Sequence, residues 1–332
     1  MSKIKIGDVI MSKSIENSRS ENSGIRKRRG SGKIILIILL IILAIPLYLG
    51  LDVYFRTSSL LNEINREVDT IDLRQQQNLP ELVLGETPFS LLILGIDSDF
   101  PGDPGRSDAI MIATVNPNEG TAYLVSIARD TRTYIEGRGF EDKINHAYAF
   151  GGAAMSIDTV QTFLDVPIDF YVTLSMDGFG PLVDAIGGVR VYNDTVEFTQ
   201  SGYSFPLGYV DLHGDSALAF SRMRMQDPQG DFGRQQRQRS IIGAMLSEMA
   251  GVNVVTRYQN ILGAAEDYMQ TDVSLNEMIR ISTGYTTALR NVTDLQMRGQ
   301  GQMINGIYYE IIPEYQRLEM SQRLRSHLEI SE

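Results

Sequence analysis

The chain has 332 residues, a length that supports one large domain or two small ones with a buried core. It contains no cysteine, which excludes disulfides, thiolate metal sites and cysteine nucleophiles. The net charge of −11 is unevenly distributed: residues 1–33 carry nine Lys and Arg against three Asp and Glu, a charge of +6, which leaves −17 for the rest. The two parts of the chain are therefore predicted to occupy different surroundings.

A long apolar run separates these two parts. Eighteen residues from Ile34 to Leu51 carry no charge, and as a helix they would be about 27 Å long, sufficient to cross the hydrocarbon core of a membrane. A buried core helix is rarely apolar on every face, and a cleaved signal peptide usually has a shorter apolar region. Residues 34–54 are therefore predicted to be an uncleaved, single-pass signal anchor in the cell membrane. The basic residues before it predict a cytoplasmic N-terminus and an extracellular domain after it.

The segments on either side of the anchor differ in character. Residues 1–33 are rich in Ser, Asn, Lys and Arg without a hydrophobic period, which predicts a disordered cytoplasmic tail. Because its positive charge already has a topological explanation, no nucleic-acid partner is expected. Residues 55–85 are predicted to form a juxtamembrane helix and then a linker over residues 74–80. The helical spacing is carried by Leu60, Leu61, Ile64, Val68 and Ile71.

The remaining residues, 86–332, read as one extracytoplasmic domain. A short apolar run from Pro88 predicts a buried strand, and Asp97 lies just past its end. Residues 108–115 and 121–127 predict two strands joined by a five-residue connection as a hairpin. Further helices are predicted at 153–163, 181–185, within 240–289 and from 314, and further strands at 169–174, 188–192, 295–298 and 306–312. The pattern predicts an α/β fold, with a mixed, largely antiparallel central sheet covered by helices on both faces.

Carboxylates gather after the first predicted strand. The stretch from Gly95 to Asp108 holds Asp97, Asp99, Asp103 and Asp108 among glycines and prolines. Without histidine or cysteine, such a group suits a hard cation such as Mg²⁺ or Mn²⁺. An EF-hand is rejected, because Pro101 removes the fifth-position ligand and the twelfth position is aspartate. The alternative is that these aspartates only cap turns.

A basic stretch lies between Leu212 and Arg239 and contains five arginines. Arg222 and Arg224 alternate as on one side of an extended segment, whereas Arg234 begins a predicted helix with Asp231 as its N-cap. A helix N-terminus beside guanidinium groups suits a phosphate or pyrophosphate. The alternative is a solvated network in which the arginines pair with nearby aspartates.

Two more stretches place charge beyond a strand end. Residues 126–132 put Arg129, Asp130 and Arg132 just after the second strand of the hairpin. Residues 142–152 contain His146, which is not assigned as a base because a lone histidine is most often a structural donor. The sequence has no Gly-x-Ser-x-Gly elbow and no Walker loop.

Several motifs occur in a fixed order across about residues 89–251. They read GRSDAIMIATVNP, SIARDT, DKINHAYAFGG, DAIGGV, ALAFSRMR and GDFGRQQRQ. This motif core resembles the LytR-CpsA-Psr family of bacterial cell-envelope proteins, and the preceding anchor also fits that family. The resemblance implies a phosphotransferase that moves an anionic glycopolymer, such as teichoic acid or capsular polysaccharide, from an undecaprenyl-pyrophosphate carrier to the muramic acid of peptidoglycan. It also implies assistance by Mg²⁺ and a hydrophobic pocket for the polyprenyl chain.

The resemblance also assigns residues. The metal-associated aspartates of the family match Asp97 and Asp108. The pyrophosphate-binding arginines match Arg106, Arg129, Arg132, Arg222, Arg224 and Arg234. Our hypothesis is that one of the two metal-associated aspartates, or Asp130, helps to deprotonate the incoming sugar hydroxyl. The predicted catalytic set is then Asp97, Asp108, Arg129, Asp130, Arg222 and Arg234.

Two other functions use the same residues and stay open at this point. In a hydrolase acting on lipid-linked glycans, water would replace the sugar acceptor. In a non-enzymatic protein, the domain would only bind the lipid carrier or regulate.

Overall fold

The computed structural model describes residue 55 and residues 65–98, 103–250, 260–264 and 266–330. The predicted tail and anchor lie outside the described residues. Within the described ranges, no helix has both the length and the apolar character that a membrane crossing requires.

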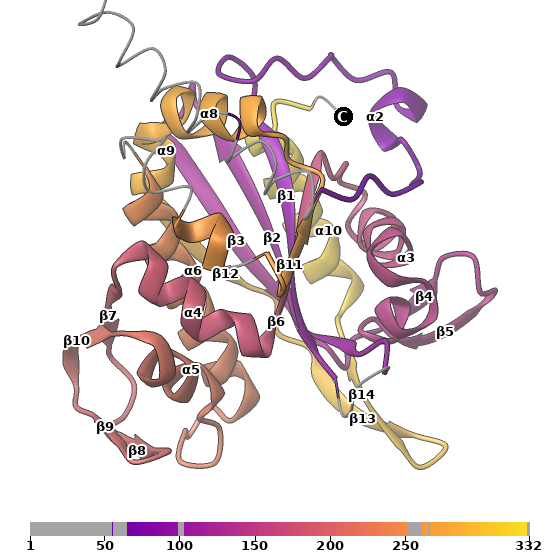
Figure 1. Ribbon diagram of the computed structural model, residues 1–332. Helices are drawn as coiled ribbons and strands as arrows, with labels where there is room; N and C mark the ends of the chain where they lie inside the picture. Colours follow the sequence, from indigo (N-terminus) through magenta and orange to yellow (C-terminus); the bar gives the residue numbers. More distant parts are fainter. Residues whose placement is uncertain (1–54, 56–64, 99–102, 251–259, 265, 331–332) are drawn as a thin grey trace, which may run out of the picture. The chain divides into compact units, whose positions relative to one another are not determined.

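The centre of the domain is a six-stranded sheet in the order β11-β6-β1-β2-β3-β12 (Figure 1). Neighbouring strands pair antiparallel except for β1 with β6 and β3 with β12, which are parallel. The strands are β1 (Phe89–Asp97), β2 (Arg106–Asn116), β3 (Thr121–Ile127), β6 (Phe170–Ser175), β11 (Met269–Thr271) and β12 (Val292–Gln296). The predicted α/β fold with a mixed central sheet is thus confirmed.

Helices cover both faces of the sheet (Figure 1). Alternate residues along the strands point to opposite faces. In β2, Ile110 and Ile112 pack with α3 (His146–Leu164) and α10 (Glu314–His327), whereas Met111 and Ala113 pack toward Ile242 of α6 (Asp231–Met249). Because both faces are covered, β2 is buried almost throughout and reads in the sequence as a continuous apolar run. The other helices are α2 (Leu73–Gln76), α4 (Met176–Ile186), α5 (Gly214–Arg222), α8 (Leu275–Gly284) and α9 (Thr286–Arg290).

Four two-stranded ribbons accompany the sheet in the part of the chain that the structure describes. They are β4 (Arg132–Ile135) with β5 (Phe140–Lys143), β7 (Val189–Asn193) with β10 (Gly208–Leu212), β8 (Phe198–Gln200) with β9 (Tyr203–Phe205), and β13 (Gln300–Ile304) with β14 (Ile307–Ile311). One of them reaches the end of β3, where the backbone N–H of Glu310 in β14 donates to the carbonyl of Asp130 at 2.8 Å. The C-terminal region thus contributes directly to the edge of the sheet where the predicted charged residues lie.

Some local predictions are wrong. Arg222 does not lie on an extended segment but is the last residue of α5, a short helix whose start is closed by reciprocal bonds between His213 and Ser216. Asp231 is the first residue of α6 and not its N-cap, which is Gly230. The expected strand at 295–298 begins earlier, as β12, because Val292 to Gln296 pair in parallel with β3. The strands that were not expected are β4, β5, β8, β9, β10, β11 and β13.

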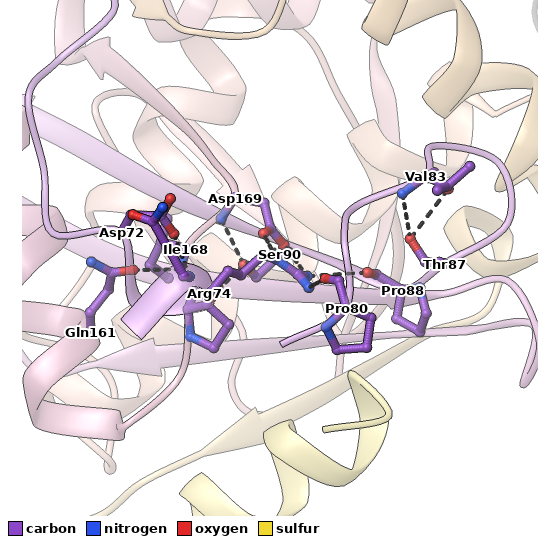
Figure 2. A network of polar contacts seen from close by, with 12 residues as sticks. Asp72, Arg74, Pro80, Val83, Thr87, Pro88, Ser90, Gln161, Ile168 and Asp169 are labelled. Atoms are coloured by element: carbon purple, nitrogen blue, oxygen red, sulfur yellow. Dashed lines mark hydrogen bonds and ion pairs between the residues drawn. The ribbon is translucent and has the colours of Figure 1, made fainter. Parts of the chain in front are cut away.

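The segment before β1 packs on the domain (Figure 2). Asn65 forms an isolated bridge with Thr271, so the helical spacing expected over residues 60–71 does not give a helix in the part that the structure describes. Arg74, in the short helix α2, forms an ion pair with Asp169, with 2.9 Å between Nη2 and Oδ2. Asp169 also accepts hydrogen bonds from the backbone N–H and the hydroxyl of Ser90, at 2.8 and 3.1 Å. This contact links the segment to the starts of β1 and β6.

Candidate functional site

The charged residues meet at one edge of the sheet. Strands β1 and β3 end there and β2, antiparallel to both, begins there. Asp97, the last residue of β1, is the register partner of Arg106, the first residue of β2, and both are exposed. Gly95 pairs with Ala109 and the next residue of β1 pairs with Ser107, which leaves Asp108 without a register partner. Asp108 therefore lies in a β-bulge, a feature that re-aims a side chain and is frequent beside active sites.

Asp108 forms an ion pair with Arg129, through Oδ2 and Nη1. Asn145, just before α3, places its Nδ2 3.5 Å from Oδ1 of the same carboxylate. Burial lowers the pKa of Arg129, but the carboxylates of Asp108, Asp130 and Asp231 outweigh it, so the pKa lies above the ordinary value. The pair joins the start of β2 to the end of β3.

Asp130 is held by a second cation. Its Oδ1 lies 2.7 Å from Nζ of Lys143 at the end of β5, and its Oδ2 lies 3.8 Å from Nε of Arg129. His146 lies four residues from Asp142 and pairs with it, with 2.7 Å between Nδ1 and Oδ2. The stretch 142–152 therefore contributes Lys143 and Asn145 to this edge of the sheet, two residues that the sequence analysis did not assign.

The first turn of α6 adds Arg234. Its Nη2 lies 2.6 Å from Oδ1 of Asp231, and 14% of its side chain is exposed. Burial lowers the pKa of Arg234, and the positive charges of Arg129 and Arg224 lower it further, against the raising effect of Asp231 and Asp108. Like charges disfavour one another's charged form. Arg129 and Arg224 therefore lie close enough to Arg234 to repel its guanidinium group, and a bound anion would relieve that repulsion.

A polar cavity of about 330 Å³ opens beside this group, between the end of β3, the start of α6 and β14. Its walls include Arg129, Asp130, Arg224, Asp231, Phe232 and Gln235. From β14 it receives Tyr308 and Glu310, to which no sequence motif pointed. The side chain of Gln235 is buried, and its Oε1 has no hydrogen-bond partner among the described residues.

A second cavity, lined almost wholly by apolar side chains, lies between the sheet and helices α4, α5 and α6. It holds about 40 Å³. Ala109, next to Asp108, lines it, and so does Ser221, next to Arg222. Along α6, Gln235 lines the polar cavity and Gln238 lines the apolar one. The charged group thus adjoins both cavities.

Two predicted site residues line neither of these cavities. Arg222 is exposed at the end of α5. Arg132 lies in β4 and pairs with Glu141, with 2.7 Å between Nη2 and Oε2. The structure therefore brings together Asp108, Arg129, Asp130, Arg224 and Arg234, places Asp97 and Arg106 at the neighbouring strand ends, and gives Arg132 a partner in its own ribbon.

The alternative of arginine and aspartate pairs applies in part, because Arg234 pairs with Asp231 and Arg237 pairs with Asp227. Arg237 is buried and forms an ion pair with Asp227, and it donates to the carbonyls of Phe220, at 3.2 Å, and Met223. It thereby fixes the connection between α5 and α6. Arg224 has no ion pair among the described residues and lines the polar cavity, so it is available to a ligand.

The carboxylates present suit a cation that is shared with a substrate. Among the described residues, no group of three or more His, Asp and Glu side chains is arranged to hold a metal ion. Asp97 and Asp108 offer two carboxylates at neighbouring strand ends. Mg²⁺ usually binds through one or two carboxylates together with substrate phosphates and water, and not in an all-protein cage. The donor set therefore fits Mg²⁺ on a phosphate-bearing ligand.

An edge that combines guanidinium groups, carboxylates and a helix N-terminus beside an apolar cavity suits a class of protein whose ligands bear phosphate. The model of the LytR_cpsA_psr family matches residues 47–326, and the chain belongs to this family.

The similarity to curated relatives and to solved structures is consistent with this family membership. The polyisoprenyl-teichoic acid–peptidoglycan teichoic acid transferase TagU of Halalkalibacterium halodurans is 45% identical over 283 residues, which cover 85% of this chain and 93% of the relative. The crystal structure of TagU from B. subtilis is 38% identical with a TM-score of 0.61, over 73% of this chain and 97% of that one. A structure of TagT bound to LIIa-WTA is 29% identical with a TM-score of 0.64, over 76% and 95% of the two chains.

Proposed function

We propose that this protein transfers an anionic glycopolymer, of the teichoic acid or capsular polysaccharide type, from an undecaprenyl-pyrophosphate carrier to peptidoglycan. The observation that carries the proposal is the convergence of Arg129, Arg224 and Arg234 at the edge of the sheet, beside the carboxylate of Asp108. The names of the TagU relatives support the same reaction. The anchor at residues 34–54 would hold the domain at the outer surface of the cell membrane.

The arginines supply what phosphoryl transfer needs. This chemistry depends mainly on positioning and on neutralising the charge of the transferred and leaving groups. Arg129, Arg224 and Arg234 would bind the pyrophosphate, whose negative charge offsets their mutual repulsion. Arg106 and Arg222 are exposed near the same strand and helix ends and would contact the outer phosphate oxygens.

Asp97 and Asp108 would hold Mg²⁺, or Mn²⁺ in its place. When bound, the cation would neutralise charge on the phosphates. Asp108 would keep one oxygen on Arg129 and so orient this arginine toward the same ligand.

The apolar cavity would receive the first isoprene units of the carrier. Its volume of about 40 Å³ is a few times the roughly 10 to 15 Å³ that one water molecule needs in a cavity. Helices α4, α5 and α6 would have to move away from the sheet to admit the lipid.

The test uses the full chain in detergent with a polyprenyl-pyrophosphate-linked oligosaccharide, a peptidoglycan oligomer and Mg²⁺, with the products followed by mass. Arg234→Ala should lower the rate of conjugate formation on the order of 10²- to 10³-fold, as the loss of one charge-stabilising donor does in other enzymes. Arg190→Ala is the matched control, because Arg190 forms an exposed ion pair with Asp211 on the β7–β10 ribbon. Its rate should equal that of the unchanged protein.

The products also separate the alternatives. An Arg234→Ala protein as fast as the unchanged chain would remove the role given to this arginine. Free polymer phosphate without conjugate would indicate a hydrolase, and carrier binding without turnover would indicate a lipid-carrier binding protein.

A further inference from the structure

Glu310 is a buried carboxylate at the wall of the polar cavity. Only 5% of the residue is exposed. Its Oε2 accepts a hydrogen bond from the hydroxyl of Tyr308 at 3.0 Å, and its Oε1 has no hydrogen-bond partner among the described residues. The two side chains stand two positions apart in β14 and so share one side of the strand. Tyr308 is 46% exposed and also lines the cavity.

Glu310 differs from the other carboxylates of this cavity in its partners. Asp130 pairs with Lys143, and Asp231 pairs with Arg234. No ion pair to Glu310 occurs within the part of the chain that the structure describes. A carboxylate that is already paired with a cation is a weaker proton acceptor than one without such a partner. Glu310 is therefore the best placed proton acceptor at this wall.

Burial raises the pKa of Glu310, and the neighbouring carboxylates of Asp130 and Asp231 raise it further. The Tyr308 hydroxyl and the nearby Gly299 amide partly offset this rise, although the amide lacks the geometry of a hydrogen bond to Oε1. Burial and the adjacent Glu310 raise the pKa of Tyr308 to about 12, so its hydroxyl keeps its proton and donates it to Glu310.

Two arginines and the ring of Phe232 complete the lining around Glu310 and Tyr308. Arg129 and Arg224 line the same cavity and adjoin the proposed phosphate position. Phe232 offers a ring at the wall, with the guanidinium of Arg298 5.5 Å from its centre. Aromatic faces together with a few polar groups are typical of small-molecule pockets, which span roughly 300 to 1,000 Å³. A cavity of about 330 Å³ is suited to a sugar residue.

We propose that the polar cavity receives the acceptor sugar of the transfer reaction, and that Glu310 accepts the proton of the attacking hydroxyl through Tyr308. The proposal rests on the transferase function proposed above. It assigns the general base to the C-terminal hairpin β13–β14 and not to Asp97, Asp108 or Asp130.

The step balances as follows. The oxygen of the acceptor hydroxyl forms a bond to the phosphorus that carries the polymer, and the bond from this phosphorus to the bridging oxygen breaks. The electron pair of that bond leaves with the polyprenyl phosphate. The hydroxyl proton passes to the oxygen of Tyr308 while the proton of Tyr308 passes to Oε2 of Glu310, from which it is later lost to water.

The experiment measures conjugate formation by the full chain in detergent, with the polyprenyl-pyrophosphate-linked oligosaccharide as donor and a peptidoglycan oligomer as acceptor, across a range of pH. Glu310→Gln keeps the shape of the side chain but cannot take the proton. We expect kcat to fall on the order of 10²- to 10⁴-fold, the acid limb of the pH–rate profile to disappear, and the Kd for the donor to stay unchanged. Tyr308→Phe should also lower kcat and leave the donor Kd unchanged.

Tyr309→Phe is the matched control. Tyr309 lies between the two proposed residues but faces away from them, and its hydroxyl lies 3.3 Å from Asp142. The kcat of Tyr309→Phe and the acid limb of its pH–rate profile should equal those of the unchanged chain. Glu310→Asp, which keeps the carboxylate, should recover part of the rate and the acid limb.

The outcomes separate this proposal from the one before it. If the unchanged chain forms conjugate and Glu310→Gln or Tyr308→Phe is equally fast, the base assignment is overturned and the transferase remains. A parallel loss of kcat and donor binding would assign Glu310 a structural role and overturn the proposal as well. If the unchanged chain forms no conjugate, the transferase function fails, and this inference fails with it.

Discussion

Asp272 shows how a single buried charge costs stability. Its Oδ1 accepts a hydrogen bond from the backbone N–H of Tyr171 at 2.9 Å. Burial raises its pKa to about 6, and Glu277 and Asp169 add to the rise. In the unfolded chain the pKa returns to 3.8. The folded protein therefore binds this proton more tightly, and stability declines as the pH rises from about 4 to about 6.

Asp272→Asn should remove this cost, because the amide oxygen can still accept from Tyr171. We expect the variant to be more stable on the order of 2 kcal/mol at about pH 7.5 and to show a smaller difference at about pH 4. Thermal unfolding of the full chain in detergent, followed by circular dichroism, measures this. Asp267→Asn removes an exposed neighbouring charge and should change stability by less than about 0.5 kcal/mol. Equal effects of the two variants would contradict the argument.

At the same scale, the sequence predicts only part of the site. Asp108, Arg129 and Arg234 lie in recognisable motifs, and the structure brings them together. Tyr308 and Glu310 belong to a short strand whose alternation gives no sign of where it lies in space. Only the bridge between β14 and the residues after β3 reveals that they reach the cavity.

Among the elements, the segment before β1 is attached to the sheet at two places: Arg66 bonds to Thr271 and Tyr171, and Arg74 pairs with Asp169. The side chain of Asp169 is 3% exposed and is shared between Arg74 and Ser90. Asp169→Ala would leave the Arg74 guanidinium and the Ser90 amide without their acceptor. Removing one partner of a buried ion pair costs about 3 kcal/mol or more. A loss of this size is expected in the thermal unfolding of the full chain.

An exposed ion pair provides the comparison. Glu314→Ala removes the pair between Glu314 and Arg317, in which the glutamate side chain is 69% exposed. Exposed pairs contribute up to about 1 kcal/mol. Should the two variants lose the same stability, the anchoring role of the Arg74–Asp169 contact would have to be abandoned.

The accuracy of the sequence predictions for whole elements follows from burial. Strands β1, β2, β3 and β6 are buried on both faces, and their apolar runs identify them directly. Strand β11 has only three residues, and β13 is mostly exposed, so neither leaves an apolar run to recognise. In α5, small and polar residues before Arg222 conceal a helix, which packing of Ala217 and Phe220 into the core stabilises.

At the scale of the whole molecule, His327 connects the end of α10 to the sheet, and it is 2% exposed. Its ring nitrogens lie 2.7 Å from the hydroxyl of Thr114 and 3.0 Å from that of Thr121, and the ring stacks on Tyr123. Burial lowers the pKa of His327 below its ordinary 6.5. Below this pH the unfolded chain binds a proton that the folded protein excludes. Stability is therefore full above about pH 6.5 and is lost as the pH falls toward the lowered pKa.

In the Asp272→Asn background, we expect the melting temperature of the full chain to fall between about pH 7 and pH 5, and His327→Gln to remove this dependence while lowering stability at neutral pH. Because Asp272 acts in the opposite direction below about pH 6, the comparison is made in the Asp272→Asn background. His213→Gln, at the exposed start of α5, should keep the dependence. If His327→Gln keeps the pH dependence of stability, groups other than His327 cause it.

The order of strands in the sheet has a consequence for the synthesis of the protein. Both edges, β11 and β12, come from residues after 268, whereas the four strands between them are complete by residue 175. The growing chain therefore contains a sheet whose two outer strands, β3 and β6, present unpaired backbone groups until residues 269–296 have been made. Open edges of this kind invite pairing with another chain. The C-terminal region thus covers both open edges of the sheet, and the motif core alone would remain prone to aggregation.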